Sequence, residues 1–361
     1  MKVIMVTAGM SGGGTERVIA VLANDMAEKS HEVKIVMTSR DEVAYELQSS
    51  VQVLSIGGST GGSLSKRMKR IRDLRRIFKQ DKEQVIVSFG TETNLFSLLA
   101  GIGLKNKIIV SERNDPNQCT YSVLRNIIYR MADSLIFQTE DAKNCFPKGI
   151  AKKGSVIPNP LSGEMKKPVH GARRREIVTA GRLEPQKNHR LLIKAFQGFT
   201  ERFPDYRLVI YGKGYLEEEL KALVKEFHLE RKVIFAGFAE HIQEKLCNAA
   251  MFVLSSDYEG VSNSLMEAMA LGLPVISTDC PIGGSAMLIK HKESGLLVPV
   301  GSAAALTEAM RYMAEDVERA EEMGRRAEYV REEYSAEMIC GKWIREICSQ
   351  TKMHLGGGKY T

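Results

Sequence analysis

Short runs of apolar residues alternate with longer segments in which apolar residues recur every three or four positions, and this alternation continues along most of the chain. The short runs have the length and β-branched content of buried strands, and the longer segments have the period of helices that pack on a sheet. Alternation of this kind predicts parallel βαβ units. The strands that it predicts are residues 3–7, 33–38, 51–56, 85–89, 108–111, 134–138 and 154–157, followed by 177–180, 207–211, 233–235, 252–255 and 274–277.

A basic stretch without a strand or helix pattern, residues 166–175, separates these strands into two series and follows the turn Pro158-Asn159-Pro160. The chain has 361 residues, which is too long for one ordinary α/β core and suits two. We therefore predict an α/β protein with a first domain over residues 1–160 and a second over residues 161–335, followed by a helical C-terminal segment.

The composition is that of a soluble globular protein, with 43% hydrophobic and 26% charged residues and no apolar run that could span a membrane. The six cysteines form no CxxC pair, which argues against a zinc site or a disulfide framework and favours a reducing compartment. We find no signal-peptide pattern, so we expect a cytoplasmic protein. The net charge of +7 suits phosphorylated substrates, anionic lipid or nucleic acid, and does not choose among them.

A glycine-rich turn, Gly12-Gly13-Gly14, follows the first predicted strand and leads into a helix. Backbone N–H groups in such a turn can bind an anion or a sugar, which makes Gly13 and Gly14 candidate ligand residues. A dinucleotide fingerprint fits poorly, because Arg17 stands where a third glycine would allow close packing of helix on strand. A tight turn without a ligand is the alternative.

Two cations, Arg182 and Lys187, follow the first strand of the second domain. Ligands of open parallel sheets bind beyond the carboxyl ends of the strands, so this position suits a diphosphate. Arg182 would supply planar, bidentate donors and Lys187 a mobile point charge. These two residues alone leave open a solvated charged turn.

Two acidic residues, Glu259 and Glu267, lie eight positions apart after the strand at residues 252–255. Glu259 is predicted in a loop, and Glu267 in a helix that begins near residues 262–264 and ends at Gly272. The helix start offers free N–H groups to a phosphate, and the carboxylates suit sugar and ribose hydroxyls. The residues at that start are Val261, Ser262, Asn263 and Ser264. Ordinary surface acids are the alternative, although the apolar neighbours of Glu267 argue against it.

Taken together, these motifs resemble the family 4 retaining glycosyltransferases, which have the GT-B fold. Glu259 and Glu267 match the Glu-x7-Glu motif of that family. The segment AGRL at residues 180–183 with Lys187 matches its diphosphate clamp, and GGTER at residues 13–17 is similar to its N-terminal glycine loop. VIPNP at residues 156–160 and GLLV at residues 295–298 also fit, so the resemblance covers the whole chain in order.

The resemblance implies two Rossmann-like domains whose parallel sheets face a central cleft, with a C-terminal helix at about residues 336–354 crossing back to the first. It implies that the second domain binds most of a nucleotide diphosphate sugar, UDP-linked in our prediction, from which a hexose or N-acetylhexosamine is transferred with retention. The implied catalytic residues are Arg182, Lys187 and Glu259. The implied donor-binding residues are Gly13, Gly14, Val261, Ser262, Asn263, Ser264 and Glu267. The sequence has no Asp-x-Asp motif and no clustered metal ligands, so we expect neither a cofactor nor a metal.

SERNDP at residues 111–116 and FQTE at residues 137–140 resemble the subgroup that extends polyprenyl-pyrophosphate-linked oligosaccharides in capsule, lipopolysaccharide or glycoprotein glycan synthesis. The implied acceptor is such a lipid-linked glycan, and the implied acceptor residues include Glu16 and Arg113. The chain departs from the wider family here, because Glu112-Arg113 stands where many members have a histidine near the sugar.

Eight basic residues and one acid lie between residues 66 and 79, with apolar positions at helical spacing. Lys69, Arg72, Arg76 and Lys79 would form a stripe that holds the acceptor pyrophosphate and docks on the inner face of an anionic membrane. A solvated helix face is the alternative. Nucleic acid is disfavoured because no aromatic residues are interleaved with the charges. A second stripe, at residues 121–131, is assigned to core packing.

Two other functions remain open at this point. A sugar-nucleotide epimerase or hydrolase on the same fold would need acid/base side chains at the sugar, and we identify none. A non-catalytic module that binds anionic lipid is supported by the net charge alone.

Overall fold

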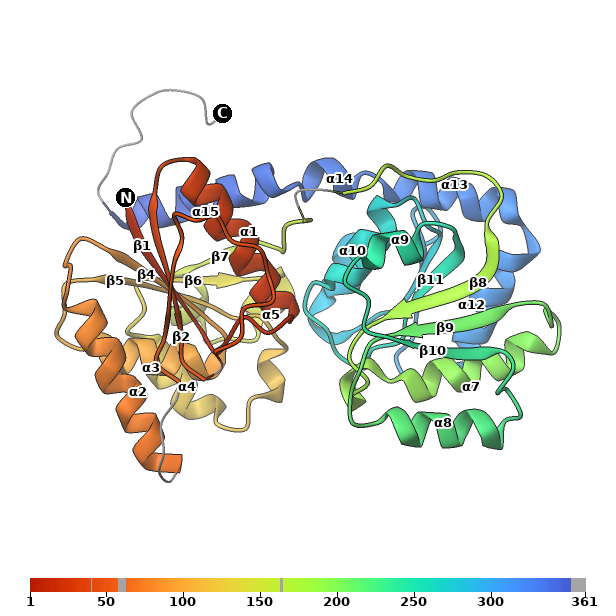
Figure 1. Ribbon diagram of the computed structural model, residues 1–361, viewed down its shortest axis with the longest axis horizontal. Coiled ribbons are helices and arrows are strands. Elements are labelled where there is room, and N and C mark those ends of the chain that lie inside the picture. Colours follow the sequence, from red (N-terminus) through yellow and green to blue (C-terminus); the bar gives the residue numbers. More distant parts are fainter. Residues whose placement is uncertain (40, 58–62, 163–164, 352–361) are drawn as a thin grey trace. The chain divides into compact units, whose positions relative to one another are not determined.

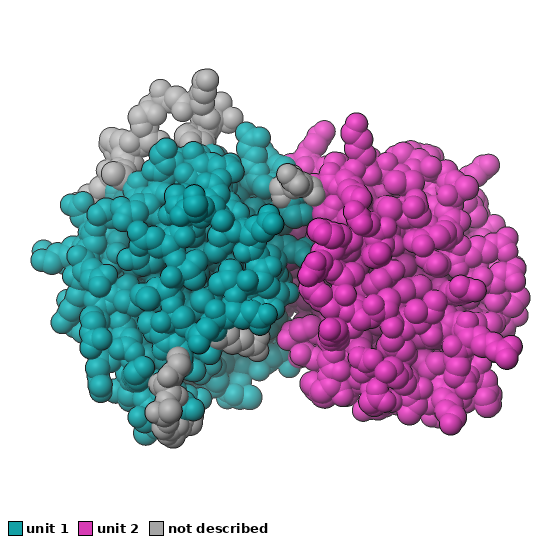
Figure 2. Space-filling model, viewed as in Figure 1, with its two compact units in different colours: residues 1–163, 334–361 teal, residues 164–333 magenta. Residues whose placement is uncertain are grey.

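The computed structural model describes residues 1–361 except residues 40, 58–62, 163–164 and 352–361. The chain divides into two compact units, which Figure 2 shows in different colours. Unit 1 comprises Met1–Gly163 and Tyr334–Thr361, and unit 2 comprises Glu164–Glu333. The predicted boundaries, after residues 160 and 335, lie close to this division.

Unit 1 contains a sheet of seven parallel strands in the order β3-β2-β1-β4-β5-β6-β7 (Figure 1). Each strand lies within one residue of its predicted ends. Apolar runs mark the central strands, which are buried between helices, whereas the edge strand β3 is exposed along its length. The strands are β1 (Lys2–Thr7), β2 (Glu32–Met37), β3 (Gln52–Ser55), β4 (Val85–Phe89), β5 (Lys107–Ser111), β6 (Ser134–Phe137) and β7 (Gly154–Val156).

Helices cover both faces of this sheet (Figure 1). On one face, α2 (Ser63–Phe78), α3 (Thr91–Gly101) and α4 (Ser122–Tyr129) share a core with the strands. On the other, α1 (Gly14–Glu28) packs beside α15 (Ala336–Gln350). The helix predicted at about residues 336–354 is therefore present as α15 and belongs to unit 1, and residues 352–354 lie outside the described residues. The shorter elements are η1 (Pro116–Gln118), α5 (Glu140–Asn144) and α6 (Lys148–Ala151).

The assignment of residues 121–131 to the core is wrong for most of that stripe. Val123, Leu124 and Ile127 are exposed on α4, and only Ile128 and Tyr129 of its apolar residues are buried. The helical period was right, but the face turned toward the sheet is not the aliphatic one, because Arg125 occupies it.

Unit 2 contains a sheet of six parallel strands in the order β10-β9-β8-β11-β12-β13. The sequence pattern does not predict the last strand, because its apolar run is only three residues long. The last two residues of the predicted linker, residues 166–175, belong to β8. The strands are β8 (Arg174–Ala180), β9 (Arg207–Tyr211), β10 (Val233–Gly237), β11 (Ala249–Leu254), β12 (Val275–Thr278) and β13 (Leu296–Val298).

The helices of unit 2 include α7 (His189–Thr200), α8 (Glu217–Glu226) and α12 (Ala303–Glu315), which share a core with the sheet. α10 (Asn263–Ala270) packs on β11 and β12. It begins after Ser262 and is followed by Gly272 at φ +71°, close to its predicted limits. The shorter or C-terminal elements are η2 (Pro185–Lys187), α9 (Ile242–Leu246), η3 (Pro281–Gly283), α11 (Gly284–Leu288), α13 (Val317–Ala327) and α14 (Val330–Glu333).

The strand order reverses once in each sheet, and this fixes where a ligand can bind. In unit 2 the chain leaves β8 for β9 on one side, and leaves β11 for β12 on the other, while β8 and β11 are neighbours. The loops after β8 and β11 therefore begin side by side and diverge, which opens a crevice at the carboxyl edge of the sheet. In unit 1 the corresponding neighbours are β1 and β4.

Candidate active site

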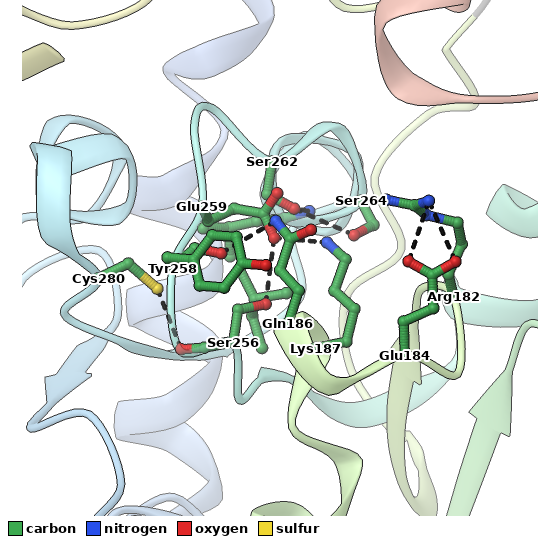
Figure 3. Close-up of polar contacts among 12 residues, drawn as sticks. Arg182, Glu184, Gln186, Lys187, Ser256, Tyr258, Glu259, Ser262, Ser264 and Cys280 are labelled. Atoms are coloured by element: carbon green, nitrogen blue, oxygen red, sulfur yellow. Dashed lines mark hydrogen bonds and ion pairs between the residues drawn. The ribbon is translucent and has the colours of Figure 1, made fainter. Parts of the chain in front are cut away.

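The loops at the reversal in unit 2 carry the predicted catalytic residues. Lys187, at the end of η2, donates from Nζ to Oε2 of Glu259 over 2.5 Å (Figure 3). The hydroxyl of Ser256 donates to the same oxygen over 3.1 Å. The side chains of Lys187 and Glu259 are only 14% and 13% exposed, so this cation and carboxylate form a largely desolvated pair at the carboxyl edge of the sheet.

Hydrogen bonds hold the two loops together. The Gln186 side chain donates to the carbonyl oxygen of Tyr258 over 3.0 Å, and the backbone N–H of Asp257 donates back to the Gln186 carbonyl over 2.9 Å. The Asn188 side chain donates to Asp257 over 2.7 Å, and its oxygen also caps α7. These residues are not among the predicted site residues, although Asn188 before a helical pattern is a recognisable N-cap signal.

Arg182 is placed differently from Lys187. Its guanidinium is 63% exposed and pairs with Glu184, with Nη1 3.0 Å from Oε2. Figure 3 shows it turned toward Glu184, apart from the Lys187–Glu259 pair. The two predicted clamp cations thus lie on one loop, but each faces its own carboxylate.

Several glycines allow the loops of this edge to approach one another. A Cβ atom added to Gly284, after β12, would lie 1.9 Å from the carbonyl oxygen of Gly260. A Cβ atom on Gly212, after β9, would lie 1.9 Å from the carbonyl oxygen of Gly181. Loops from four strands are therefore packed backbone against backbone around the pair.

The loop after β12, which is not among the predicted site residues, supports the loop that carries Glu259. The Thr278 hydroxyl donates to the carbonyl oxygen of Ser256 over 2.6 Å, and the Cys280 thiol donates to the same oxygen over 3.1 Å. Burial raises the pKa of the Cys280 thiol to about 11, so it is a neutral donor at physiological pH. Ile282, at φ +65°, holds a conformation that is strained for a β-branched residue.

The start of α10 has the predicted geometry. Ser262 is the N-cap, and its hydroxyl accepts from the backbone N–H of Leu265 over 3.5 Å. Its hydroxyl also lies 3.2 Å from that of Ser264. Val261 is buried before this turn, Asn263 opens the helix, and Glu267 is buried one turn further on. A buried carboxylate on the helix that begins beside Glu259 is not an ordinary surface acid.

His189 opens α7 beside the clamp loop, and its ring is buried. Nε2 donates to the carbonyl oxygen of Arg182 over 3.3 Å, and Nδ1 has no partner among the described residues. Burial, with a smaller contribution from the charge on Lys187, lowers the pKa of His189 to about 4. The imidazole is therefore neutral near pH 7 and positions the backbone of Arg182.

The glycine loop of unit 1 uses its donors internally. The backbone N–H groups of Gly12 and Gly13 both donate to Oε2 of Glu16 over 2.7 Å. The Tyr45 hydroxyl donates to the Gly13 carbonyl over 2.8 Å, and Gly14 is the first residue of α1. Glu16, predicted to bind the acceptor, thus acts as the N-terminal cap of α1, and the N–H of Gly13, predicted to bind the donor, is already taken.

Glu112 and Arg113 follow β5 and are both buried. Glu112 accepts from the Tyr129 hydroxyl over 2.6 Å and from Thr91 over 3.0 Å, and burial raises its pKa. Arg113 contacts the neutral side chains of Ser111 and Asn159, and its Nε has no partner within the described part of the chain. Burial lowers the pKa of Arg113 to about 9, and the described residues place no carboxylate beside it to oppose this shift.

Family models match almost the whole chain. Residues 12–162 match the model described as Glycosyltransferase Family 4, and residues 163–330 match the model described as Glycosyl transferases group 1. The chain belongs to glycosyltransferase family 4. As a family 4 glycosyltransferase it is an enzyme that transfers a hexosyl group.

Two relatives of this glycosyltransferase come from Campylobacter jejuni. It is 28% identical, over 96% of its length and 98% of the relative's, to GalNAc-alpha-(1->4)-GalNAc-alpha-(1->3)-diNAcBac-PP-undecaprenol alpha-1,4-N-acetyl-D-galactosaminyltransferase. It is 27% identical, over 85% of its length and 88% of the relative's, to N-acetylgalactosamine-N,N'-diacetylbacillosaminyl-diphospho-undecaprenol 4-alpha-N-acetylgalactosaminyltransferase.

Solved structures share the fold of this glycosyltransferase. Anabaena HepE, in complex with UDP and glucose, superposes with a TM-score of 0.84 at 17% identity, over 97% of this chain and 99% of HepE. Sucrose-phosphate synthase from Thermosynechococcus elongatus superposes with a TM-score of 0.82 at 18% identity, over 96% and 99% of the two chains. The predicted GT-B fold of two Rossmann-like domains is confirmed.

The basic stripe of the glycosyltransferase lies on α2 as predicted, with Lys69, Arg72 and Arg76 exposed and Lys79 exposed just beyond the helix end. Asp73 lies 3.6 Å from Lys69 and 3.8 Å from Arg76, so part of the charge is compensated. Of the apolar positions on this helix, Phe78 is buried, whereas Leu64 and Met68 are exposed.

Across the residues that the structure describes, no three His, Cys, Asp or Glu side chains converge in a way that would hold a metal ion. None of the described helices has both the length and the apolar character needed to cross a bilayer.

Proposed function

We propose that this glycosyltransferase transfers an N-acetylhexosamine, such as N-acetylgalactosamine, or a related hexose from a UDP-sugar to a polyprenyl-diphosphate-linked glycan at the cytoplasmic face of the membrane. The Campylobacter relatives, which are named for transfer to undecaprenol-linked glycans and match nearly the full chain, support this acceptor class. The bound UDP of HepE supports the nucleotide. The observation that carries the proposal is the largely desolvated Lys187–Glu259 pair at the strand-order reversal of unit 2.

In the proposed complex Lys187 bridges the diphosphate and Glu259. An ammonium group has three donors, so one can stay on Glu259 while another contacts a phosphate oxygen. Glu259 has a second carboxylate oxygen for a sugar hydroxyl, and this arrangement places the sugar beside the cation. Arg182 reaches the same diphosphate when its exposed side chain leaves Glu184, an exchange with little cost because exposed ion pairs are weak.

The proposed reaction needs no nucleophile from the protein. The bond between the anomeric carbon and the phosphate oxygen breaks while the acceptor hydroxyl oxygen bonds to the same face of that carbon. The departing diphosphate takes the acceptor proton, and the configuration is retained. Lys187 and Arg182 stabilise the negative charge that grows on the diphosphate, where a fixed cation is most effective.

The start of α10 and Glu267 complete the proposed donor site. Backbone N–H groups near Ser262 and Asn263 would receive a phosphate, and the buried Glu267 carboxylate would accept hydrogen bonds from ribose hydroxyls. These donors and cations supply the positive charge that a divalent metal supplies in other transferases. We therefore propose that catalysis is metal-independent and that EDTA leaves turnover unchanged.

Unit 1 would hold the acceptor. The α2 stripe is an exposed set of cations suited to the diphosphate of a lipid carrier, and Arg113 is a buried guanidinium with no carboxylate beside it in the described structure. Both features favour an anionic ligand on this unit.

An assay with separate donors and acceptors tests the proposal. The purified enzyme is incubated with UDP-N-acetylgalactosamine, UDP-N-acetylglucosamine, UDP-galactose or UDP-glucose and a synthetic polyprenyl-diphosphate trisaccharide, and the product is measured by mass spectrometry. We expect one added sugar, UDP release that requires the acceptor, and loss of both in Glu259→Gln. UDP release without acceptor would indicate a hydrolase, and interconversion of the UDP-sugars an epimerase.

A further inference from the structure

Helix α4 presents an aliphatic face to solvent and a charged side chain to the core. Val123, Leu124 and Ile127 are 74%, 53% and 57% exposed, whereas Arg125 is only 2% exposed. Surface helices of soluble proteins have the opposite arrangement, with apolar residues inward and charges outward. Tyr121 and Met131, at either end of the helix, extend the exposed apolar surface. We refer to these five apolar residues as the α4 patch.

Buried polar contacts fix the helix in this orientation. Arg125 donates to the carbonyl oxygen of Pro116 over 2.8 Å, lies 4.0 Å from Glu112 and stacks over the Phe146 ring at 4.3 Å. One turn later, the Tyr129 hydroxyl donates to Glu112 over 2.6 Å. Rotating α4 to bury the patch would remove these two partners from the buried Glu112 and break the Arg125 contacts, a loss that opposes the gain from burying three aliphatic side chains. The α4 patch is therefore a stable feature of the fold.

Several cations lie on the same face of unit 1 as this patch. α2, α3 and α4 cover one face of the sheet, and Arg75 of α2 donates to the carbonyl oxygens of Ala100 and Ile102 over 2.8 and 2.6 Å, at the end of α3. Ile102 and Met131 line a hollow of about 330 Å³ together with Lys105. Lys105 and the exposed Arg130 thus adjoin this apolar surface, and the α2 stripe lies on the same face of the sheet, beyond α3.

We propose that the α4 patch inserts into the interfacial layer of an anionic bilayer while the α2 cations contact the lipid headgroups. Aliphatic side chains framed by cations are the combination that anionic lipid surfaces bind. A second copy of the chain fits this surface poorly, because pairing the same faces would bring two α2 stripes together and Asp73 is the one acid between residues 66 and 79. The inference rests on the proposed function, in which the acceptor lies in the membrane.

Fluorescence of introduced tryptophans tests the insertion. Trp343 is the sole tryptophan and is fully buried, so it gives a constant background. Ile127→Trp should shift to shorter wavelength on vesicles that contain phosphatidylglycerol, and lipids brominated on their acyl chains should quench it. Met338→Trp is the matched control, because Met338 is about equally exposed but belongs to α15, on the opposite face of the sheet. Vesicle binding without quenching at residue 127 would overturn the proposal.

Partitioning of a polar variant provides the second test. Val123→Ser with Ile127→Ser removes apolar area that is already exposed, so folding should be unaffected and the vesicle partition coefficient should fall about 10-fold or more. Val317→Ser, at an exposed position in unit 2, should leave it unchanged. An unchanged partition coefficient in the double variant, or a self-association that the double variant abolishes, would refute membrane insertion.

Activity with a water-soluble, short-chain acceptor separates this inference from the proposed function. The double variant should retain wild-type turnover on that acceptor and lose turnover on acceptor embedded in vesicles. If no acceptor of either kind is used while Ile127→Trp is still quenched, the proposed function fails and the membrane-binding surface stands. If both acceptors are used equally well by the double variant, the inference fails and the proposed function stands.

Discussion

Lys187 and Glu259 are 72 positions apart in the chain and 2.5 Å apart in space, because β8 and β11 are adjacent strands whose following loops diverge from one point. Replacing Lys187 by Met should lower kcat about 100-fold or more, since it removes a cation from the developing diphosphate charge. It should also lower Tm, because Glu259 would stay largely buried without a counter-ion. Lys221→Met, on the exposed surface of α8, is the control and should change neither quantity. A Lys187→Met enzyme with normal kcat would remove this residue from the mechanism.

Replacing Glu267 and replacing Glu259 should affect different quantities, UDP affinity in the first case and turnover in the second. Glu267→Ala should raise the Kd for free UDP roughly 10-fold or more, because hydrogen bonds to a charged acceptor are worth about 1.5–3 kcal/mol. Glu259→Ala should leave UDP affinity nearly unchanged and lower turnover, because its role is on the sugar. Isothermal titration with UDP alone distinguishes them, and equal UDP affinity in wild type and Glu267→Ala would exclude the ribose role.

Gly284→Ala tests the close packing of the loops. Gly284 has helical backbone angles, so alanine causes no backbone strain there, but its Cβ would lie 1.9 Å from the Gly260 carbonyl oxygen. We expect a loss of roughly 1–3 kcal/mol in the free energy of unfolding and weaker UDP binding, because the segment before α10 must move. Gly149→Ala in α6, where nothing lies within 4 Å, should be neutral or slightly stabilising. Equal melting temperatures for both variants would contradict the steric argument.

His189 should make unit 2 less stable in acid. Its folded-state pKa is lowered to about 4 from an unfolded value near 6.5, so between these values the unfolded chain binds a proton that the folded chain does not. The stabilisation is complete above pH 6.5 and is lost as the pH falls toward 4, by up to about 3 kcal/mol. Urea unfolding at pH 7 and pH 5 should show this loss in wild type and a smaller one in His189→Gln. Identical pH slopes would show that the imidazole does not contribute.

The α2 stripe should control binding to anionic surfaces without affecting the donor. Changing Lys69, Arg72, Arg76 and Lys79 to Gln should weaken sedimentation with anionic vesicles by at least about 100-fold, at about 1 kcal/mol per cation and allowing for compensation by Asp73. UDP affinity should be unchanged. Four exposed cations of unit 2 changed in the same way provide the control: Arg175, Arg190, Arg202 and Lys221. Normal vesicle binding by the α2 variant would show that the stripe is a solvated surface that does not contact the membrane.

The sequence predicts the strands well because a strand between two helix layers must be apolar throughout. The sequence does not predict β13, because three residues are too few to show a periodic pattern. The positions of Lys187, Glu259 and Glu267 follow from strand ends, but the contacts around them depend on the strand order, which a one-dimensional pattern does not contain. The misassigned residues 121–131 show the same limit. Period alone cannot say which face of a helix is inward, and at α4 the buried Glu112 selects the face with Arg125.

The packing of α15 on unit 1 affects the order in which the two units can fold during synthesis. Trp343 of α15 is fully buried and its ring lies 5.5 Å from that of Phe89, so the core of unit 1 includes a segment that the ribosome synthesises after all of unit 2. During translation, residues 1–162 emerge first, with α1 but not yet α15 to cover one face of the sheet. Unit 2 follows from contiguous sequence, and unit 1 is completed only when α15 leaves the exit tunnel. The newly made enzyme therefore passes through a stage in which the second-synthesised unit is finished and the first still exposes apolar strands to chaperones.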